Sequence, residues 1–220
     1  MNARRFPVRL LVTAAAVLGL AGGCGSLVAE TPGSTATHEP TAASAAQAAK
    51  DLAKLKVAAA LSMDGYSRDK FHIWASQGGG CDTRDVVLKR DGQDVQATST
   101  CKITDGSWTS PYNEKTYHDP LQLDIDHLVP LGDAWQSGAA NWTDDKRKAF
   151  ANDLTRPQLL AVDSSDNRSK GDQDPSTWKP PNHDFWCTYA RDWVTVKAYW
   201  KLTVTTAEKA ALRDMLATCA

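Results

Sequence analysis

The sequence lacks a hydrophobic run long enough to cross a membrane. The apolar run near the N-terminus, Leu10–Leu20, has 11 residues before small residues follow it, whereas a transmembrane helix needs about 20. The mean hydropathy of the chain is −0.42. These values exclude a protein with several membrane spans, and the 42% hydrophobic content excludes a fully disordered chain.

An excess of charge is also missing. The formal net charge is −1 over 220 residues, which excludes a strongly basic, histone-like nucleic-acid binder. Any contact with nucleic acid must therefore come from a local patch of cations rather than from bulk charge. The length suffices for one domain with a substantial core, or for two small domains.

Several chemical motifs are absent as well. No Gly-x-Ser-x-Gly elbow is present, which disfavours serine hydrolysis. No Cys-x-x-Cys pair is present, which disfavours a zinc site built from cysteines. Without Cys24, four cysteines remain, and they allow three disulfide connectivities. We favour the two pairs that are nearest in sequence, Cys81–Cys101 and Cys187–Cys219.

The N-terminus has the layout of an export signal over residues 1–23. Three arginines precede the apolar run, and small residues follow it up to Cys24. Ala-Gly-Gly-Cys resembles a bacterial lipobox, which predicts acylation of Cys24 and a lipoprotein on the outer face of the cell membrane. The alternative is simple cleavage after Gly23 or Ala29 and a secreted protein. Either way, loss of residues 1–23 leaves a net charge of −4.

Residues 24–48 are expected to form a flexible tether. Within them, residues 31–48 contain no Val, Ile, Leu, Met or aromatic side chain, so they cannot bury enough apolar surface to fold. All eight tryptophans lie after residue 70. We therefore place the folded domain at residues 49–220.

Hydrophobic periodicity predicts a mixture of helices and strands. Helices are expected over residues 49–61, 83–90, 143–152, 186–200 and 205–219, and strands over 95–104, 121–126 and 158–162. Aromatic residues recur along 186–200 at helical spacing. We interpret this stripe as a face packed on the core rather than as a platform for stacking bases.

Two polar segments carry the chemistry. The strand over 121–126 leads into Asp126-His127, and Asn167-Arg168-Ser169-Lys170 lies about forty residues further on. Asp126 and Asn167 offer hard oxygen ligands for one divalent metal ion, Mg²⁺ in preference to Mn²⁺. His127 could take a proton from an attacking water. Arg168 and Lys170 could hold neighbouring phosphates.

Asp-x-Asp-His-x-x-Pro followed by Asn-x-x-Lys resembles the HNH (ββα-metal) nucleases. Among these, it is similar to the C-terminal nuclease domain of some modification-dependent restriction enzymes, and most of all to small exported bacterial HNH-family endonucleases. The resemblance covers about residues 65–219. It includes residues outside the two segments, among them Trp74, Trp108, Trp135 and Trp178.

This resemblance implies an α+β fold in which a ββα-metal core is embedded in helices and tied by two disulfides. It also implies roles: His127 as the general base, and Asp126 and Asn167 as the metal ligands. The middle position of the family motif, usually an Asn that braces the loop behind the His, corresponds to Gln158. Asn152 is a second candidate for that role.

The function expected on these grounds is metal-dependent endonucleolytic hydrolysis of DNA or RNA, with little sequence specificity and 5′-phosphate products. No protein partner is implied. One alternative is a non-catalytic lipoprotein that binds a ligand or the cell wall. Another is a hydrolase that acts on a different phosphodiester, or a metal-dependent esterase, through the same residues.

Overall fold

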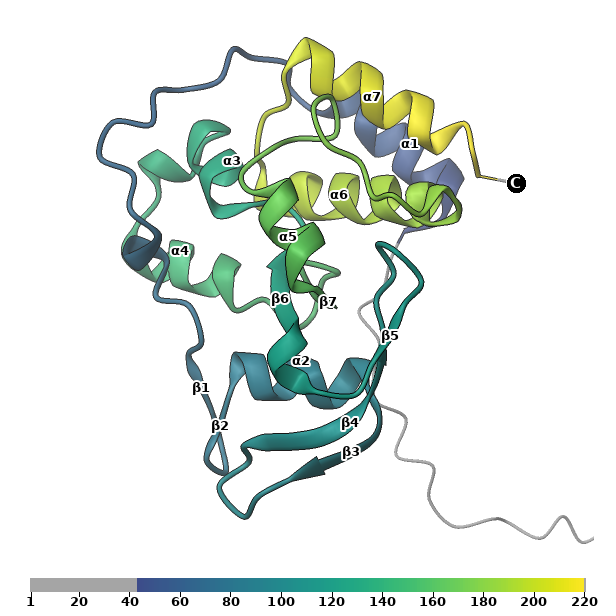
Figure 1. Ribbon diagram of the computed structural model, residues 1–220. Helices are drawn as coiled ribbons and strands as arrows, with labels where there is room; N and C mark the ends of the chain where they lie inside the picture. Colours follow the sequence, from purple (N-terminus) through teal and green to yellow (C-terminus); the bar gives the residue numbers. More distant parts are fainter. Residues whose placement is uncertain (1–42, 220) are drawn as a thin grey trace, which may run out of the picture. The chain divides into compact units, whose positions relative to one another are not determined.

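The computed structural model describes residues 43–219 (Figure 1). The predicted signal peptide, Cys24 and most of the predicted tether lie outside this range. The helices are α1 (Ala45–Lys54), α2 (Thr83–Asp91), α3 (Leu131–Gln136), α4 (Asp144–Ala151), α5 (Ser164–Lys170), α6 (Trp186–Trp200) and α7 (Thr206–Leu216). The strands are β1 (Ser76–Gly78), β2 (Cys81–Asp82), β3 (Gln93–Ala97), β4 (Ile103–Thr109), β5 (Thr116–Tyr117), β6 (Leu123–His127) and β7 (Leu159–Asp163). Short 3₁₀ turns are η1 (Arg68–Phe71), η2 (Pro120–Gln122), η3 (Ala139–Asn141) and η4 (His183–Phe185).

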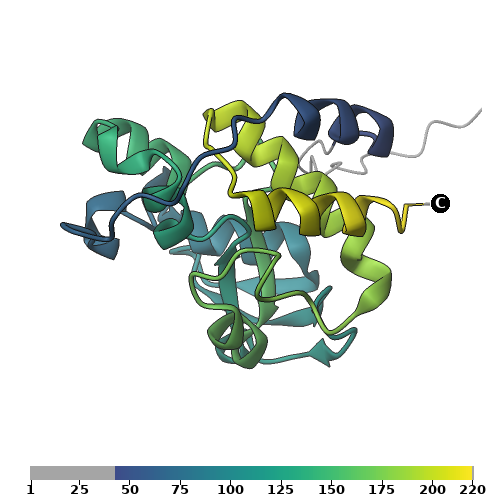
Figure 2. The ribbon, with the colours of Figure 1, turned by 90° about the horizontal axis from the view of Figure 1, so that it is seen from above.

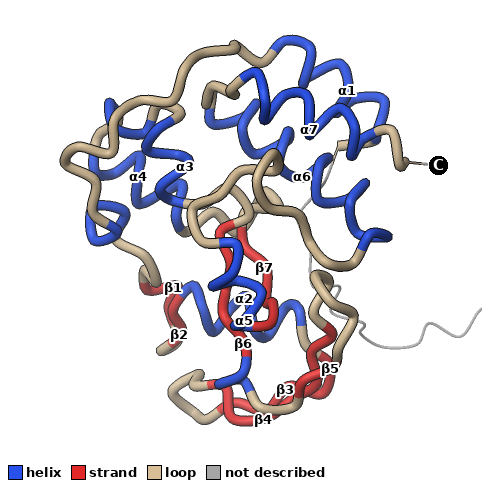
Figure 3. The backbone as a smooth tube through the Cα atoms, turned by 45° about the horizontal axis from the view of Figure 1, so that its top comes forward, coloured by secondary structure: helices blue, strands red, loops and turns tan. Residues whose placement is uncertain are grey.

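The antiparallel ribbon of β6 and β7 organises the fold. Its register pairs Leu123 with Asp163 at one end and His127 with Leu159 at the other. Helix α5 follows β7 directly, so two strands and a helix form a ββα unit. Figure 3 shows this pair of strands in red with α5 beside it. The residues between the two strands, which include α3 and α4, form a long excursion rather than a tight turn.

Alternation along β6 separates two environments. Leu123 and Ile125 are buried in a hydrophobic cluster with side chains of α2 and β4. Asp124 and Asp126 point to the opposite face because successive residues of a strand alternate. There they contact side chains of α5. A single strand thus carries both a core face and a polar face, as the period-2 pattern of the sequence predicts.

Helices α1, α6 and α7 pack together as a second layer (Figure 2). The Cys187–Cys219 disulfide joins the start of α6 to the residues after α7. At the start of α7, Thr205 and Glu208 form a capping box. Both features agree with the sequence analysis, and the second predicted disulfide, Cys81–Cys101, is also present.

The aromatic stripe of α6 faces the core, as predicted. Tyr189, Trp193 and Val196 have no exposed surface, and Trp200 is 8% exposed. The Trp200 ring packs against Trp142 and Phe150, and the rings of Tyr189 and Trp193 pack against each other. They are therefore covered and do not form a platform for bases.

A buried ion-pair network ties α6 to α3 and α7. The ammonium of Lys197 lies 2.7 Å from a carboxylate oxygen of Asp133 and 2.7 Å from one of Glu208. Trp193 Nε1 donates to the same Glu208 oxygen. Burial raises the pKa of Glu208 to about 7, with the Lys197 charge opposing that shift. Lys197 already supplies the counter-ion that these two carboxylates need.

Two elements differ from the sequence prediction. The first helix runs over Ala45–Lys54 rather than 49–61, because Ser44 caps it and because residues after Leu55 instead pair with the chain near Val204. Residues 45–48, predicted to be part of the tether, therefore lie in a helix. The predicted strand 95–104 is a hairpin of β3 and β4, because the chain reverses between Thr98 and Lys102. No helix within residues 43–219 is long and apolar enough to span a membrane.

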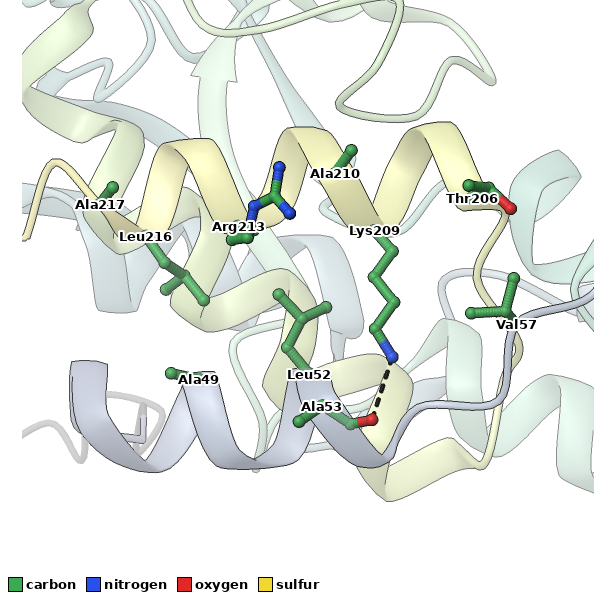
Figure 4. Close-up of a pocket in the computed structure, with 10 residues that line it drawn as sticks. All are labelled: Ala49, Leu52, Ala53, Val57, Thr206, Lys209, Ala210, Arg213, Leu216 and Ala217. Atoms are coloured by element: carbon green, nitrogen blue, oxygen red, sulfur yellow. Dashed lines mark hydrogen bonds between the residues drawn. The ribbon is translucent and has the colours of Figure 1, made fainter.

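A hollow of about 630 Å³ lies between α1 and α7 (Figure 4). Its walls are mostly alanine, leucine and valine side chains, with Lys209 and Arg213 as the charged members. The Lys209 ammonium donates to the backbone oxygens of Ala53 and Leu55. Among the described residues, no side-chain carboxylate, imidazole or amide lines this hollow, so its walls offer no group suited to hydrolytic chemistry.

The buried carboxyl of Asp192 leads to a stability prediction. Asp192 is 4% exposed, and its Oδ1 has no hydrogen-bond partner among the described residues. Burial raises its pKa from 3.8 to about 7. The folded protein thus holds a proton that the unfolded chain releases, so the contribution of Asp192 to stability falls as the pH rises from about 4 through 7.

We expect Asp192→Asn to be more favourable at high pH. The difference in unfolding free energy between this variant and the wild type should shift in favour of the variant by about 2 kcal/mol between pH 5 and pH 8. Denaturant unfolding at both pH values measures this, and an equal difference at both would contradict it.

Candidate active site

A cleft of about 260 Å³ lies at the end of strand β6. It brings together residues from the two predicted segments with Tyr66 and with Arg68 of η1, which are distant from them in sequence. Its walls are Tyr66, Arg68, Ile125, Asp126, His127, Pro130, Leu131, Asn167, Gly171 and Asp172. The predicted base and both predicted metal ligands therefore line a single cleft.

His127 is held from two sides. Its Nε2 lies 2.9 Å from the backbone oxygen of Ala151, at the end of α4, and its ring stacks on Trp74 with centroids 5.7 Å apart. Because a carbonyl can only accept, Nε2 carries the proton and Nδ1 has the free lone pair. Burial lowers the pKa of His127 to about 3, so the ring is neutral at physiological pH.

Gln158 braces the loop that follows His127. Its side-chain amide donates to the backbone oxygen of Val129 at 2.9 Å and accepts from the Val129 N–H at 3.1 Å. Its own backbone oxygen accepts from the Leu128 N–H. Gln158 is fully buried. The longer side chain thus contacts the loop in the manner expected of the middle residue of the family motif, although a catalytic role for it stays a prediction.

We expect Gln158→Ala to lower the free energy of unfolding by about 2–4 kcal/mol, because it leaves the buried N–H and C=O of Val129 without partners. Urea denaturation measures the loss. Gln158→Glu is the matched variant: its carboxylate can still accept from Val129 N–H but cannot donate while ionised. Because this carboxylate would be buried without a counter-ion, the variant should be at least as destabilised as Gln158→Ala at pH 8, and less so at pH 5, where the carboxyl can take up a proton and donate to Val129. A loss below about 0.5 kcal/mol for Gln158→Ala would show that Val129 finds other partners.

Asn152, the second bracing candidate, secures a different loop. Its Nδ2 donates to the backbone oxygen of His72, and its Oδ1 accepts from the Ala75 N–H. These bonds fix the segment that carries Trp74, whose φ of 59° is rare for an aromatic residue. Asn152 therefore acts on the Trp74 side of His127, while Gln158 acts behind the His127 loop.

Asp126 is buried and makes two strong hydrogen bonds. Lys170 Nζ donates to Oδ1 at 2.8 Å, and the Tyr112 hydroxyl donates to Oδ2 at 2.5 Å. Burial raises the pKa of Asp126, and the Lys170 ammonium opposes that shift. Burial together with the Asp126 charge raises the pKa of Tyr112 well above 10, so Tyr112 remains a donor. Each carboxylate oxygen still has a second acceptor position.

Asn167 lies on α5 opposite Asp124. Its Nδ2 donates to Asp124 Oδ2 at 3.2 Å. With the amide nitrogen engaged in this way, Oδ1 is left as the acceptor of this side chain. An amide oxygen and a carboxylate lining one cleft are hard donors of the kind that Mg²⁺ and Mn²⁺ prefer. The chemistry of these donors is therefore compatible with the predicted metal ion, while its binding by Asp126 and Asn167 stays a prediction.

The two cations expected to hold phosphates have different environments. The side chain of Lys170 has no exposed surface, because its ammonium binds Asp126 and the backbone oxygen of His127. In this structure it contacts the predicted metal ligand instead of solvent. Arg168 has a side chain that is 76% exposed, with Nε 3.9 Å from Asp124. Arg168 does not line the cleft, and its contact with a phosphate stays a prediction.

Sequence reasoning missed several residues of the site. Tyr112 lies on the loop between β4 and β5, and nothing near it in the sequence connects it to Asp126. Arg68 precedes the two motif segments by more than fifty residues. The sequence did contain an indication that Asp172 belongs to the site, since this residue directly follows Lys170-Gly171. Its Oδ1 accepts from the Gly132 N–H at 3.0 Å, and a Cβ at position 132 would lie 2.4 Å from its Cγ. Because Asp172 lies so close, only glycine fits at position 132.

The fold and the cleft define a disulfide-bonded α+β protein with a ββα unit that presents a histidine, a carboxylate and an amide together. Residues 82–215 match the family model described as GmrSD restriction endonucleases, C-terminal domain. The chain belongs to this family. Membership suggests a nuclease-like function and a nucleic-acid substrate.

A relative from the fungus Arthroderma benhamiae (strain ATCC MYA-4681 / CBS 112371), named as an uncharacterized secreted protein, is 51% identical over 180 residues. The match covers 82% of this chain and 88% of that relative. Its name and the two disulfides fit an extracellular location. Because that relative is fungal, the expected assignment to a bacterial group is not supported. No solved structure matches the chain significantly.

Proposed function

We propose that the protein is an exported, metal-dependent endonuclease that hydrolyses phosphodiester bonds of DNA, and of RNA where its backbone fits the cleft. The observation that carries this proposal is the convergence of His127, Asp126 and Asn167 on one cleft. The neutral state of His127 and its free Nδ1 add the chemistry of a general base.

In this proposal each residue has a defined task. His127 Nδ1 accepts a proton from the attacking water, while Ala151 and Trp74 keep the ring in place. The negative charge of a bound phosphate would raise the low pKa of His127 and so strengthen it as a base. Asp126 and Asn167 would hold the divalent ion, which supplies charge stabilisation to the phosphoryl oxygens when it is bound. Lys170 and Tyr112 orient Asp126 through its two oxygens.

The proposed specificity is low. The cleft is small, and no separate base-reading module precedes or follows the ββα unit within residues 43–219. Recognition would therefore depend on the phosphate backbone, which carries no sequence information directly. The substrate would be nucleic acid of any sequence outside the cell. Acylation of Cys24 and membrane attachment stay predictions, since Cys24 lies outside the described residues.

The metal ligands provide the test of this proposal. We expect Asn167→Ala to raise the Mg²⁺ concentration needed for half-maximal cleavage of plasmid DNA by about 10-fold or more, because a protein ligand is lost. Asn167→Asp keeps an oxygen donor but sets a second carboxylate beside Asp124, so it should need less Mg²⁺ than Asn167→Ala. Titration of Mg²⁺ and Mn²⁺ in a plasmid-nicking assay measures both effects.

Two results would contradict the proposal. One is a wild-type protein with intact disulfides that nicks plasmid equally in EDTA and in Mg²⁺. The other is a folded wild-type protein that cleaves neither DNA nor RNA in either metal, which would favour the non-catalytic binding protein considered above.

A further inference from the structure

We infer that Arg68 binds a substrate phosphate adjacent to the scissile phosphate, so that the enzyme prefers polynucleotides to isolated phosphodiesters. This inference rests on the proposed nuclease function and deepens it. Three observations support this inference: Arg68 lines the cleft, its turn is firmly anchored, and its side chain has no partner among the described residues.

The turn that carries Arg68 is firmly anchored. Its last residue, Phe71, has no exposed surface and packs against Trp135 and Phe150. Arg147 Nε donates to the backbone oxygen of Lys70. Arg68 is itself exposed, yet it lines the cleft beside Asp126 and His127. A fixed backbone that presents a free side chain to the site is suited to binding a ligand.

Arg68 is the arginine without an internal partner within residues 43–219. The other arginines of this range each form a hydrogen bond or an ion pair: Arg84, Arg90, Arg147, Arg156, Arg168, Arg191 and Arg213. Lys170, the cation that the motif suggested for a phosphate, is buried against Asp126. Arg68 is therefore the cleft-lining cation that is free to meet an anion, and a guanidinium fork matches a phosphate well.

The position of Arg68 relative to the metal ligands favours an adjacent phosphate. It forms no ion pair with Asp126, although its charge acts on both Asp126 and His127. A divalent ion held by Asp126 and Asn167 would already offset much of the charge of the phosphate it contacts, so a second cation gains more from a phosphate that has no counter-charge. The favourable place for this cation is at the next phosphate along the strand.

Arg68→Ala tests the inference with two substrates. On a DNA oligonucleotide we expect kcat/KM to fall about 10- to 100-fold, since a charge-assisted contact is lost. For binding to duplex DNA, the slope of the logarithm of the binding constant against the logarithm of the salt concentration should become less steep by about 0.9. On bis(4-nitrophenyl) phosphate, which has no adjacent phosphate, the loss should be several-fold smaller than on the oligonucleotide, because only the effect of the Arg68 charge on Asp126 and His127 is then removed. Lys70→Ala is the matched control. Lys70 is a cation of the same turn, but its side chain does not line the cleft.

The outcomes separate this inference from the proposed function. Unchanged oligonucleotide cleavage and salt slope in Arg68→Ala would overturn it, and so would an equal loss on both substrates, which would place Arg68 on the scissile phosphate. If wild type cleaves nothing, the proposed function fails. Oligonucleotide binding in EDTA then still decides the role of Arg68: weaker binding by Arg68→Ala than by Lys70→Ala supports the contact, and equal binding refutes it.

Discussion

His127→Ala is expected to lower the rate of metal-dependent DNA cleavage by at least 100-fold, because a positioned general base contributes about 10²- to 10⁴-fold. The structure gives the reason: the ring is neutral, its Nε2 is bound by Ala151, and Nδ1 has the only free lone pair of this side chain. Single-turnover cleavage of a labelled duplex at saturating Mg²⁺ measures the chemical step directly. Binding of the duplex should change far less.

His118→Ala is the matched control for this prediction. His118 is exposed, lies outside the cleft and should leave the rate unchanged. Circular dichroism of both variants verifies that they are folded. A folded His127→Ala variant with more than a tenth of the wild-type rate would remove His127 from the chemistry and leave the cleft without a base.

The second large effect concerns Lys170. Lys170→Met should lower the free energy of unfolding at pH 7 by about 3–5 kcal/mol, because it leaves the buried carboxylate of Asp126 without its counter-ion. Burial already raises the pKa of Asp126, and Lys170 opposes that shift. Without the lysine the pKa of Asp126 should rise further, so Asp126 takes up a proton more readily as the pH falls. The deficit should therefore shrink between pH 7 and pH 4.5.

Two comparisons make the Lys170 prediction specific. Combining Lys170→Met with Asp126→Asn should recover much of the loss, since no unpaired charge is then buried. Lys115→Met, at an exposed lysine, should change stability by less than about 0.5 kcal/mol. A Lys170→Met deficit below about 1 kcal/mol, or one independent of pH, would show that Asp126 does not depend on the Lys170 charge.

The parts of the fold with strong local signals followed from the sequence. The aromatic spacing predicted Trp186–Trp200 as a helix at its observed bounds. The alternating Leu and Asp residues predicted β6, although its first expected residues form the turn η2. Both disulfides joined the cysteines nearest in sequence. In each case one periodicity or one short separation determined the element.

Other parts depended on contacts that no local pattern reveals. The region 95–104 has the composition of one strand, but pairing between Ala97 and Ile103 folds it into a hairpin. The first helix ends at Lys54 because the following residues pair with the chain near Val204, about 150 positions later. In both cases tertiary pairing overrides the local propensity.

The candidate site likewise has a part that the sequence predicts and a part that depends on tertiary packing. The motif indicated that His127, Asp126 and Asn167 belong to one site, and they line one cleft because β6 pairs with β7 and α5 follows β7 directly. It gave no indication that Lys170 would be buried or that Tyr112 would bind Asp126. Those facts depend on how distant segments pack over the polar face of β6. The same holds for Arg68, which reaches the cleft through the anchoring of η1.

Incubation of supercoiled plasmid with the wild-type protein, disulfides intact, in Mg²⁺, in Mn²⁺ and in EDTA tests the central claim most directly. We predict conversion to nicked and linear forms in the presence of either metal, complete inhibition by EDTA and recovery when the metal is added back in excess. Intact plasmid under all three conditions, with a protein shown to be folded, would contradict the assignment of this cleft as a nuclease active site.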